Sequence, residues 1–336
     1  MTSLYPLKFL PILKERVWGS NRLSKDYGKN AEEGTKIGES WELSGVQDNI
    51  SIISNGFLEG NNLEEVIEVY MGDLVGEEIF EKFGREFPLL IKLIDANEDL
   101  SVQVHPPDEL AQERHHAYGK TEMWYVLEAT ENASIYTGFN QEMSKELYIE
   151  SLHKGDIVEK LNVETPEPGD VFFIPSGRVH AIGKGVVLTE IQQTSDITYR
   201  IWDWNRNGLD GKPRELHTQL SVDAIDYNIY ESYKTSTHSE LNKTVNIIDC
   251  NYFTTNLIEL DKPIVKDYSL TDSFVIYICI NGNAILEWEG KNMSMVKGET
   301  VLIPAIMDKV CIRPDSSTRI LEVYIRQGFE KQVSKN

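Results

Sequence analysis

The chain has 336 residues, of which 40% are hydrophobic and 26% charged, and its formal net charge is −21 at pH 7. This length allows two domains, and the composition is that of an ordinary globular protein. The negative charge, without a stripe rich in lysine and arginine, argues against binding to nucleic acid. It does not exclude a small phosphorylated ligand, because one or two local cations are enough to bind one.

No apolar run approaches the ~20 residues that cross a bilayer, so we expect no membrane partner. The N-terminus also lacks the basic and apolar segments of a signal peptide. The three cysteines, Cys250, Cys279 and Cys311, are odd in number and show no CxxC spacing. They predict neither a disulfide framework nor a thiolate metal site, and they favour the reducing cytoplasm as the location.

In the first 60 residues, short apolar runs alternate with turn residues and predict short strands. Residues 62–83 then predict a helix or a helix pair, because Asn62 can cap and apolar residues follow at helical spacing from Leu63 to Tyr70. Residues 87–94 have the pattern of a buried strand that is interrupted by Lys92.

From residue 101 to about 203, short β-prone segments follow one another closely and are separated by glycine-rich turns. Two helical insertions are predicted among them, at residues 108–116 and 141–153. Many short strands with such turns favour a sandwich or barrel over a βαβ fold. The predicted fold class is therefore mainly β, with a few helical insertions.

A polar stretch at residues 228–242 resembles a linker, and a second β-rich block follows it. The pattern Gly-[Asp/Glu]-x-x-x-Ile-Pro occurs once on each side of the stretch, at residues 169–175 and 298–304. We interpret this as a duplicated barrel. The predicted domains are residues 1–227, which hold the site and the helical insertions, the linker, and residues 243–330.

Four polar residues form a candidate metal site. Gln103 and His105 lie two apart on a predicted strand and so face the same side. Glu122 begins the next apolar strand, and His180 follows the glycine- and proline-containing turn. Two imidazoles, a carboxylate and an amide oxygen suit Zn²⁺ and would also accept Mn²⁺, Co²⁺ or Fe²⁺.

A single histidine near a turn is usually a solvated or capped side chain, and we interpret His115, His116, His153 and His217 in that way. The combined pattern of four residues favours a metal at the candidate site. The second block has no histidine after His238, so it lacks metal ligands. We expect that block to be structural, through packing or oligomer contacts, and a homodimer stays open.

The spacing of these motifs resembles the cupin barrel, with glutamine in place of its first histidine and an insertion between His105 and Glu122. Those departures, with the segments 87–92, 101–106 and 190–200, resemble type I mannose-6-phosphate isomerases of the short bacterial form. The resemblance implies two cupin domains and interconversion of mannose 6-phosphate and fructose 6-phosphate. The partner would be a small sugar phosphate, and the cofactor one Zn²⁺ or another divalent metal per chain.

The isomerisation moves a proton between neighbouring carbons through an enediolate, whose charge a zinc ion can stabilise as a Lewis acid. Lys120 and Glu190 are both candidates for the base, and the sequence leaves the choice open. Arg200 matches an active-site arginine of the family, and its planar fork suits phosphate or an enediolate oxygen. Asp196 could orient Arg200.

Three further residues are predicted to contact the substrate. Ser101 resembles a phosphate contact of the family, Arg206 would supply a second cation, and Lys92 would line the site. Two other functions remain as alternatives, namely a cupin dioxygenase with Fe²⁺ and a non-catalytic double-cupin regulator that binds sugar phosphates. A regulator would leave the sugar phosphate unchanged, so turnover separates it from the isomerase.

Overall fold

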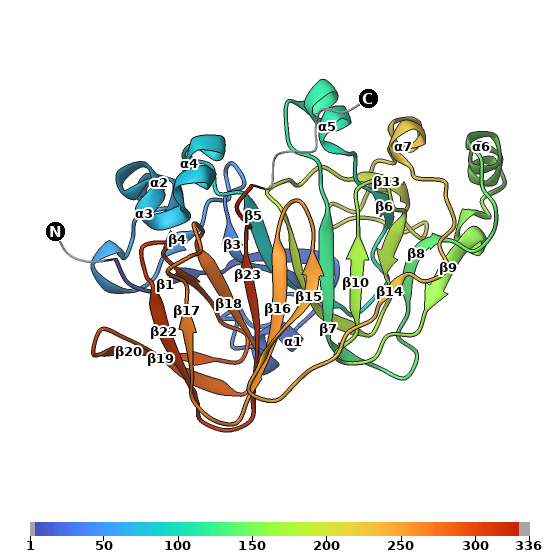
Figure 1. Cartoon of the computed structure of the whole chain (residues 1–336). Coiled ribbons are helices and arrows are strands. Elements are labelled where there is room, and N and C mark those ends of the chain that lie inside the picture. Colours follow the sequence, from blue (N-terminus) through green and yellow to red (C-terminus); the bar gives the residue numbers. More distant parts are fainter. Residues whose placement is uncertain (1–3, 329–336) are drawn as a thin grey trace. The chain divides into compact units, whose positions relative to one another are not determined.

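The structure, a computed structural model, describes residues 4–328, and the chain divides into two compact units (Figure 1). The first unit contains residues 13–41 and 89–236. The second contains residues 4–12, 42–88 and 237–328, so the N-terminal third of the chain contributes to both units. Most elements are antiparallel strands and the helices are short, which confirms the predicted mainly β fold.

The first unit is built from two antiparallel sheets. In spatial order, the larger sheet contains β14 (Lys234–Thr235), β10 (Val171–Ile174), β7 (Glu122–Ala129), β12 (Val186–Gln193), β5 (Leu89–Ala96), β3 (Ile37–Ser44) and β2 (Ile12–Ser20). The smaller sheet contains, also in spatial order, β13 (Tyr199–Trp202), β6 (Val102–Val104), β11 (His180–Ile182), β8 (Ile135–Phe139) and β9 (Leu161–Glu164).

The second unit likewise contains two antiparallel sheets. One has the order β15 (Thr244–Asp249), β16 (Thr254–Leu260), β23 (Thr318–Tyr324), β18 (Val275–Asn281), β21 (Thr300–Ile303), β1 (Leu7–Leu10) and β4 (Ile52–Ile53). The other has the order β17 (Ile264–Asp267), β22 (Lys309–Pro314), β19 (Asn283–Trp288) and β20 (Lys291–Val296).

The helices lie in the connections between strands (Figure 1). Those of the first unit are α1 (Arg22–Asp26), α5 (Asp108–His115), α6 (Lys145–Lys154), η2 (Ile157–Lys160) and α7 (Thr218–Ala224). Those of the second unit are η1 (Gly56–Leu58), α2 (Leu63–Tyr70), α3 (Gly72–Val75) and α4 (Glu77–Phe83). As predicted, Asn62 caps α2 through a reciprocal pair of hydrogen bonds with Glu65.

The two sheets of the first unit pack face to face. Alternate residues of each strand point inward and form the core between the sheets. Trp124, Phe172 and Leu188 of the larger sheet are fully buried in one cluster with Ile135 and Ile182 of the smaller sheet. The polar side chains of the candidate site continue these inward-facing rows toward one end of the sandwich.

The repeated sequence motif forms the same turn in both units. Gly169 and Gly298 both have positive φ values, of 98° and 87°. The acidic residue that follows each glycine accepts a backbone hydrogen bond from the residue three positions earlier, at 2.7 Å for Asp170 and 2.8 Å for Glu299. The motif therefore encodes a turn that needs a glycine in the left-handed region and an acidic cap.

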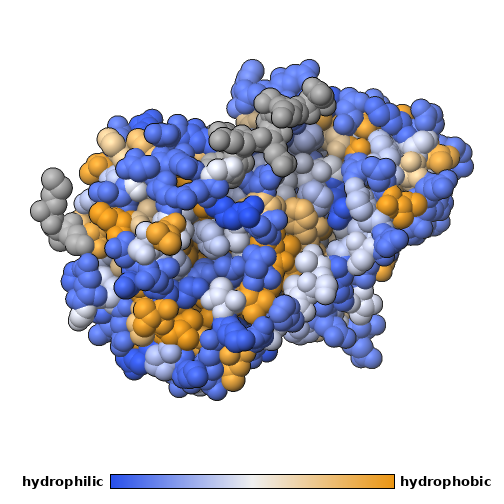
Figure 2. Space-filling model, in the orientation of Figure 1, coloured by the Kyte–Doolittle hydropathy of each residue, from blue (hydrophilic) through white to orange (hydrophobic). Residues whose placement is uncertain are grey.

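On the face shown in Figure 2, hydrophilic residues cover most of the surface, with scattered hydrophobic patches. Within residues 4–328, no helix has both the length and the apolar character that a membrane crossing requires.

Candidate active site

Strand register in the larger sheet brings distant acidic and basic residues into neighbouring positions. Glu190 of β12 lies opposite Trp124 of β7 on one side and Lys92 of β5 on the other. Glu122 lies opposite Gln192, two residues further along the same strands. Since residues two apart on a strand share a face, Glu122 and Glu190 both point into the interior of the sandwich.

The smaller sheet supplies a second row. His180 of β11 lies opposite Gln103 of β6 and opposite Thr137 of β8. Gln103 in turn lies opposite Arg200 of β13. Paired residues on neighbouring strands project to the same face, so Arg200 belongs to the same row as two candidate metal ligands.

The insertion between His105 and Glu122 folds back so that its two ends meet. The backbone N–H of Lys120 donates to the Pro106 carbonyl at 3.3 Å, and that of Gly119 donates to Asp108 Oδ1 at 2.8 Å. A Cβ atom on Gly119 would lie 2.6 Å from the Asp108 nitrogen, so only glycine permits this approach. The insertion thus returns the chain beside His105 immediately before Glu122.

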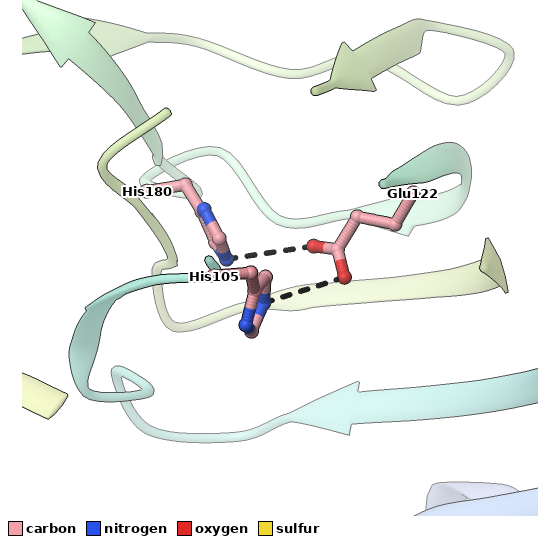
Figure 3. Close-up of side chains that lie close together, drawn as sticks. All are labelled: His105, Glu122 and His180. Carbon is pink, nitrogen blue, oxygen red and sulfur yellow. Dashed lines mark ion pairs between the residues drawn. The ribbon is translucent and has the colours of Figure 1, made fainter. Parts of the chain in front are cut away.

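His105, Glu122 and His180 come together in the interior, as Figure 3 shows. Glu122 Oε2 lies 3.5 Å from His105 Nε2, and Glu122 Oε1 lies 3.4 Å from His180 Nε2. One ligand atom from each residue falls within 4.8 Å of the others, and all three side chains are buried. Within residues 4–328 this is the one group of its kind.

Both histidines are held in the orientation that a metal requires. His105 Nδ1 donates to the Ile197 carbonyl and His180 Nδ1 donates to the Arg178 carbonyl, each at 2.8 Å. These bonds place the proton of each ring on Nδ1 and leave each Nε2, on the side of Glu122, as the nitrogen that carries the lone pair. Burial lowers the pKa of His180 to about 3, and burial together with Lys120 lowers the pKa of His105 well below its usual value. Both rings are therefore neutral at physiological pH.

Two further observations test whether a metal fits. Glu122 Oε1 is buried without a hydrogen-bond partner, and burial, reinforced by Glu190, raises the pKa of Glu122 to about 7. A buried carboxylate oxygen without a partner is unfavourable, and a cation between the ligands would remove this cost. Gln103 Nε2 lies 3.2 Å from His180 Nε2, and rotation of its amide would present Oε1 there instead. The four predicted residues therefore fit a divalent metal.

Lys120 is the cation closest to the three ligands. Its Nζ lies 3.0 Å from His105 Nε2 and also donates to Glu122 Oε2. The side chain is 4% exposed, so this lysine belongs to the interior and not to the solvated surface. Its amine is therefore in contact with two of the residues that would hold the metal, His105 and Glu122.

Glu190 and Lys92 form a buried ion pair beside this group. Lys92 Nζ lies 2.8 Å from Glu190 Oε1, and Trp124 Nε1 donates to Glu190 Oε2 at 2.9 Å. Burial would raise the pKa of Glu190, but Lys120 and Lys92 outweigh it and lower the pKa to about 2. Burial would likewise lower the pKa of Lys92, but Glu190 and Glu39 raise it above its usual value. Both groups are charged.

Arg200 belongs to a cluster of three arginines around one buried acid, Asp203. Arg206 donates to Asp203 Oδ1 through Nε and Nη2, at 3.2 and 3.1 Å, and Arg214 donates to both carboxylate oxygens. Burial, followed by Arg214, lowers the pKa of Arg200, whose Nε is buried without a partner. Three arginines outnumber the two nearby acids, Asp203 and Glu215, and in an acidic chain such a cluster suits an anionic ligand.

Arg214 was not predicted from the sequence, because an arginine in a polar loop is usually solvated. A usable signal was the concentration of Arg200, Arg206, Lys212 and Arg214 in one short segment of a chain with a net charge of −21.

Ser101 is buried immediately before β6, as expected for a residue that lines the interior. Asp196 is exposed, and the side-chain partners of Arg200 and Asp203 described above do not include it. Arg200 instead donates to the Glu215 carbonyl at 2.9 Å, and its backbone N–H donates to His217 Nδ1 at 3.1 Å. The predicted orienting role of Asp196 has no support from these contacts.

Two face-to-face antiparallel sheets that enclose a His–Glu–His cluster define a cupin-type barrel with a site for a metal. Comparison with known proteins agrees. Residues 7–147 match the model of the phosphomannose isomerase type I catalytic domain, and residues 242–325 match that of the mannose-6-phosphate isomerase cupin domain.

Relatives and solved structures extend this match over nearly the whole chain. Mannose-6-phosphate isomerase ManA of Bacillus subtilis is 39% identical over 74% of this chain and 77% of its own length. The enzyme of Streptococcus mutans is 38% identical over 66% of this chain and 67% of its own length. A crystal structure of the Bacillus subtilis mannose 6-phosphate isomerase superimposes with a TM-score of 0.85 and 32% identity, covering 95% of this chain and 99% of that one.

The chain therefore belongs to the type I mannose-6-phosphate isomerase family. This confirms the resemblance found in the sequence and identifies the protein as an aldose–ketose isomerase.

Proposed function

We propose that this protein interconverts mannose 6-phosphate and fructose 6-phosphate with a divalent metal held by Gln103, His105, Glu122 and His180. The observation that carries the proposal is the paired orientation of the two histidines around an unpartnered oxygen of buried Glu122. Zn²⁺ is the metal that we expect, because two neutral imidazoles and one carboxylate form a common catalytic zinc set. We also retain the prediction of a cytoplasmic enzyme of carbohydrate metabolism.

When bound, the metal would act as a Lewis acid toward the negative charge that develops on the substrate oxygens during proton transfer. The protein must supply three further functions, namely a proton carrier, a rigid charged environment and a grip on the phosphate.

Lys120 is the better candidate for the proton carrier. Its Nζ is in contact with His105 and Glu122, so a substrate that approaches the metal ligands also approaches this amine. Glu190 is the weaker candidate, because a carboxylate with a pKa of about 2 that is bound by Lys92 and Trp124 is a poor base. We assign Glu190 to the positioning of the two lysines.

The arginine cluster is the proposed site of the phosphate group. Arg200 lies next to Gln103 in the row of the smaller sheet, so the cluster begins beside the metal ligands. Asp203 holds Arg206 and Arg214 with their forks fixed, which lowers the entropy lost when an anion binds. Ser101 remains a proposed phosphate contact, and Lys92 and Asp196 remain proposed substrate contacts.

The domain division at residues 228–242 also remains a prediction. Part of that segment, Lys234–Thr235, pairs with β10 of the first unit. We propose that the second unit has a structural role. Assembly of the protein into a homodimer remains a prediction.

The proposal is tested by incubating the protein with mannose 6-phosphate, with added Zn²⁺ or Mn²⁺ and with a chelator, and by following fructose 6-phosphate. We expect conversion that the chelator abolishes and added metal restores. Absence of conversion with either metal would refute the isomerase. Binding of the sugar phosphate without turnover would favour the regulator, and consumption of oxygen would favour the dioxygenase.

A further inference from the structure

One turn of the first unit is connected to both histidines of the candidate metal site. The N–H of Gly177 donates to the His105 carbonyl at 2.9 Å. The carbonyl of the next residue, Arg178, accepts the hydrogen bond from His180 Nδ1. A displacement of this turn would therefore move the backbone of one ligand and the ring of the other.

The turn carries an arginine whose side chain is held by aromatic rings. The guanidinium carbon of Arg178 lies 4.5 Å from the ring centroid of Tyr230 and 5.1 Å from that of Tyr233. Arg178 Nη1 also donates to the Phe173 carbonyl at 3.3 Å. A planar guanidinium in contact with two aromatic rings is much more restricted than a solvated one.

The two tyrosines are themselves anchored. Tyr230 donates its hydroxyl to Asp226 Oδ2 at 2.6 Å, and the Asp226 N–H donates to the Gly177 carbonyl at 2.8 Å. Tyr233 donates its hydroxyl to the Phe139 carbonyl at 3.0 Å. Its ring packs on Gly138, where a Cβ would come within 2.2 Å of the ring and where φ is +68°. The segment 226–233 is thus fixed to the turn at one end and to β8 at the other.

We propose that Arg178, Tyr230 and Tyr233 form a positioning clamp for the metal site, which holds the Arg178 carbonyl where it orients His180. The clamp is joined to the metal site through the Arg178 carbonyl, so it acts through the histidine ring. Groups that orient metal-bound histidines commonly change metal affinity by about 10- to 100-fold when they are altered. This inference rests on the proposed metal site.

The clamp is tested with Tyr230→Ala, because Tyr230 is 41% exposed and its loss should leave the fold intact. Tyr230→Phe keeps the ring and removes only the hydroxyl. Arg178→Lys keeps the charge but removes the planar fork. Phe83→Ala is the matched control, because it also removes an aromatic ring beside a cation, but in the second unit. Lys82 Nζ lies 5.0 Å from the centroid of the Phe83 ring.

The measurements are the affinity for Zn²⁺, by competition with a coloured chelator, and the visible absorption spectrum of the Co²⁺-loaded protein. We expect Tyr230→Ala and Arg178→Lys to weaken Zn²⁺ binding about tenfold and to alter the Co²⁺ spectrum. Tyr230→Phe should largely keep the wild-type Zn²⁺ affinity and Co²⁺ spectrum, and Phe83→Ala should change neither. The melting temperature of the metal-free protein should be nearly the same for all variants.

Wild-type affinity and an unchanged Co²⁺ spectrum in both Tyr230→Ala and Arg178→Lys would overturn the clamp alone, since the metal site itself would still be intact. If the wild-type protein bound neither Zn²⁺ nor Co²⁺, both the clamp and the proposed metal site would be wrong.

Discussion

Glu190 and Lys92 face each other on adjacent strands, β12 and β5, and form a buried ion pair of 2.8 Å. Each side chain is less than one-tenth exposed. Buried ion pairs add little net stability, but removal of one partner leaves an uncompensated charge in the interior. The pair is therefore best explained by a role in the site, and this explanation leads to the first prediction.

Replacement Glu190→Gln should reduce kcat by at least about 100-fold while metal content stays near one per chain. The change removes the carboxylate paired with the buried ammonium group of Lys92, so we also expect about 2–4 kcal/mol of destabilisation. Steady-state kinetics, metal analysis and thermal unfolding measure the three quantities. The control is Glu150→Gln, which removes an exposed pair with Lys154 and should change none of them. Full activity in Glu190→Gln would contradict the assignment.

Replacement His180→Ala should abolish both metal content and turnover. The imidazole supplies a ligand atom within the cluster and cannot be replaced by the alanine methyl group. Metal analysis after dialysis, with an assay of fructose 6-phosphate, checks this. His153→Ala, at an exposed position of α6, is the matched control. A variant at His180 that keeps its metal would show that the ligand set is wrong.

Replacement Lys120→Met should separate metal binding from catalysis. The methionine side chain has a similar length but no amine, so Zn²⁺ should still bind to His105, Glu122 and His180 while kcat falls by about 10²–10⁴-fold. Steady-state kinetics and metal analysis of the same preparation check both parts. If the variant retained wild-type kcat, Lys120 would be excluded as the proton carrier and Glu190 would become the candidate.

Replacement Arg214→Ala should raise KM for mannose 6-phosphate by about tenfold or more and weaken competitive inhibition by inorganic phosphate to a similar extent. The phosphate would lose one charge-assisted donor. Asp203, which binds both Arg206 and Arg214, would then hold only Arg206. Metal content should not change. Arg114→Ala, which removes an arginine paired with exposed Asp223, should leave KM and the inhibition constant as they are. An unchanged inhibition constant in Arg214→Ala would place the phosphate elsewhere.

Replacement Glu322→Ala tests the structural role of the second unit. Glu322 is 2% exposed and binds Asn256 Nδ2 and Lys266 Nζ, both at 2.8 Å, as well as the hydroxyl of Tyr268. Its loss removes a buried carboxylate to which an ammonium, an amide and a hydroxyl group donate, so we expect about 3–5 kcal/mol of destabilisation, measured by chemical unfolding. The folded fraction should keep its metal affinity. A loss of metal from the folded fraction would instead connect this unit to the metal site.

Several elements could be predicted from sequence because their causes are local. Asn62 and the apolar spacing after it predict α2, and the glycine–acid motif predicts the turns at Gly169 and Gly298. The helical insertions were also found, although α6 begins at Lys145, after its capping residue Ser144, rather than at residue 141. A cap depends on a few neighbouring residues, so a single sequence reveals it.

The fold class and the candidate metal ligands could be read from the chain alone, because strand alternation and the spacing of His105, Glu122 and His180 are visible along it. The choice of Lys120 over Glu190 as the proposed proton carrier depends on the folded chain. The position of Arg214 beside Arg206 likewise depends on it. Those assignments depend on strand register and on a shared carboxylate, Asp203.

Register and ion pairing join residues that are far apart or in irregular loops, where no periodic pattern marks the partner. The same holds for the clamp on Arg178, whose aromatic rings come from a polar segment that resembled a linker. Local spacing therefore revealed which residues could bind a metal, and long-range packing established what surrounds and orients them.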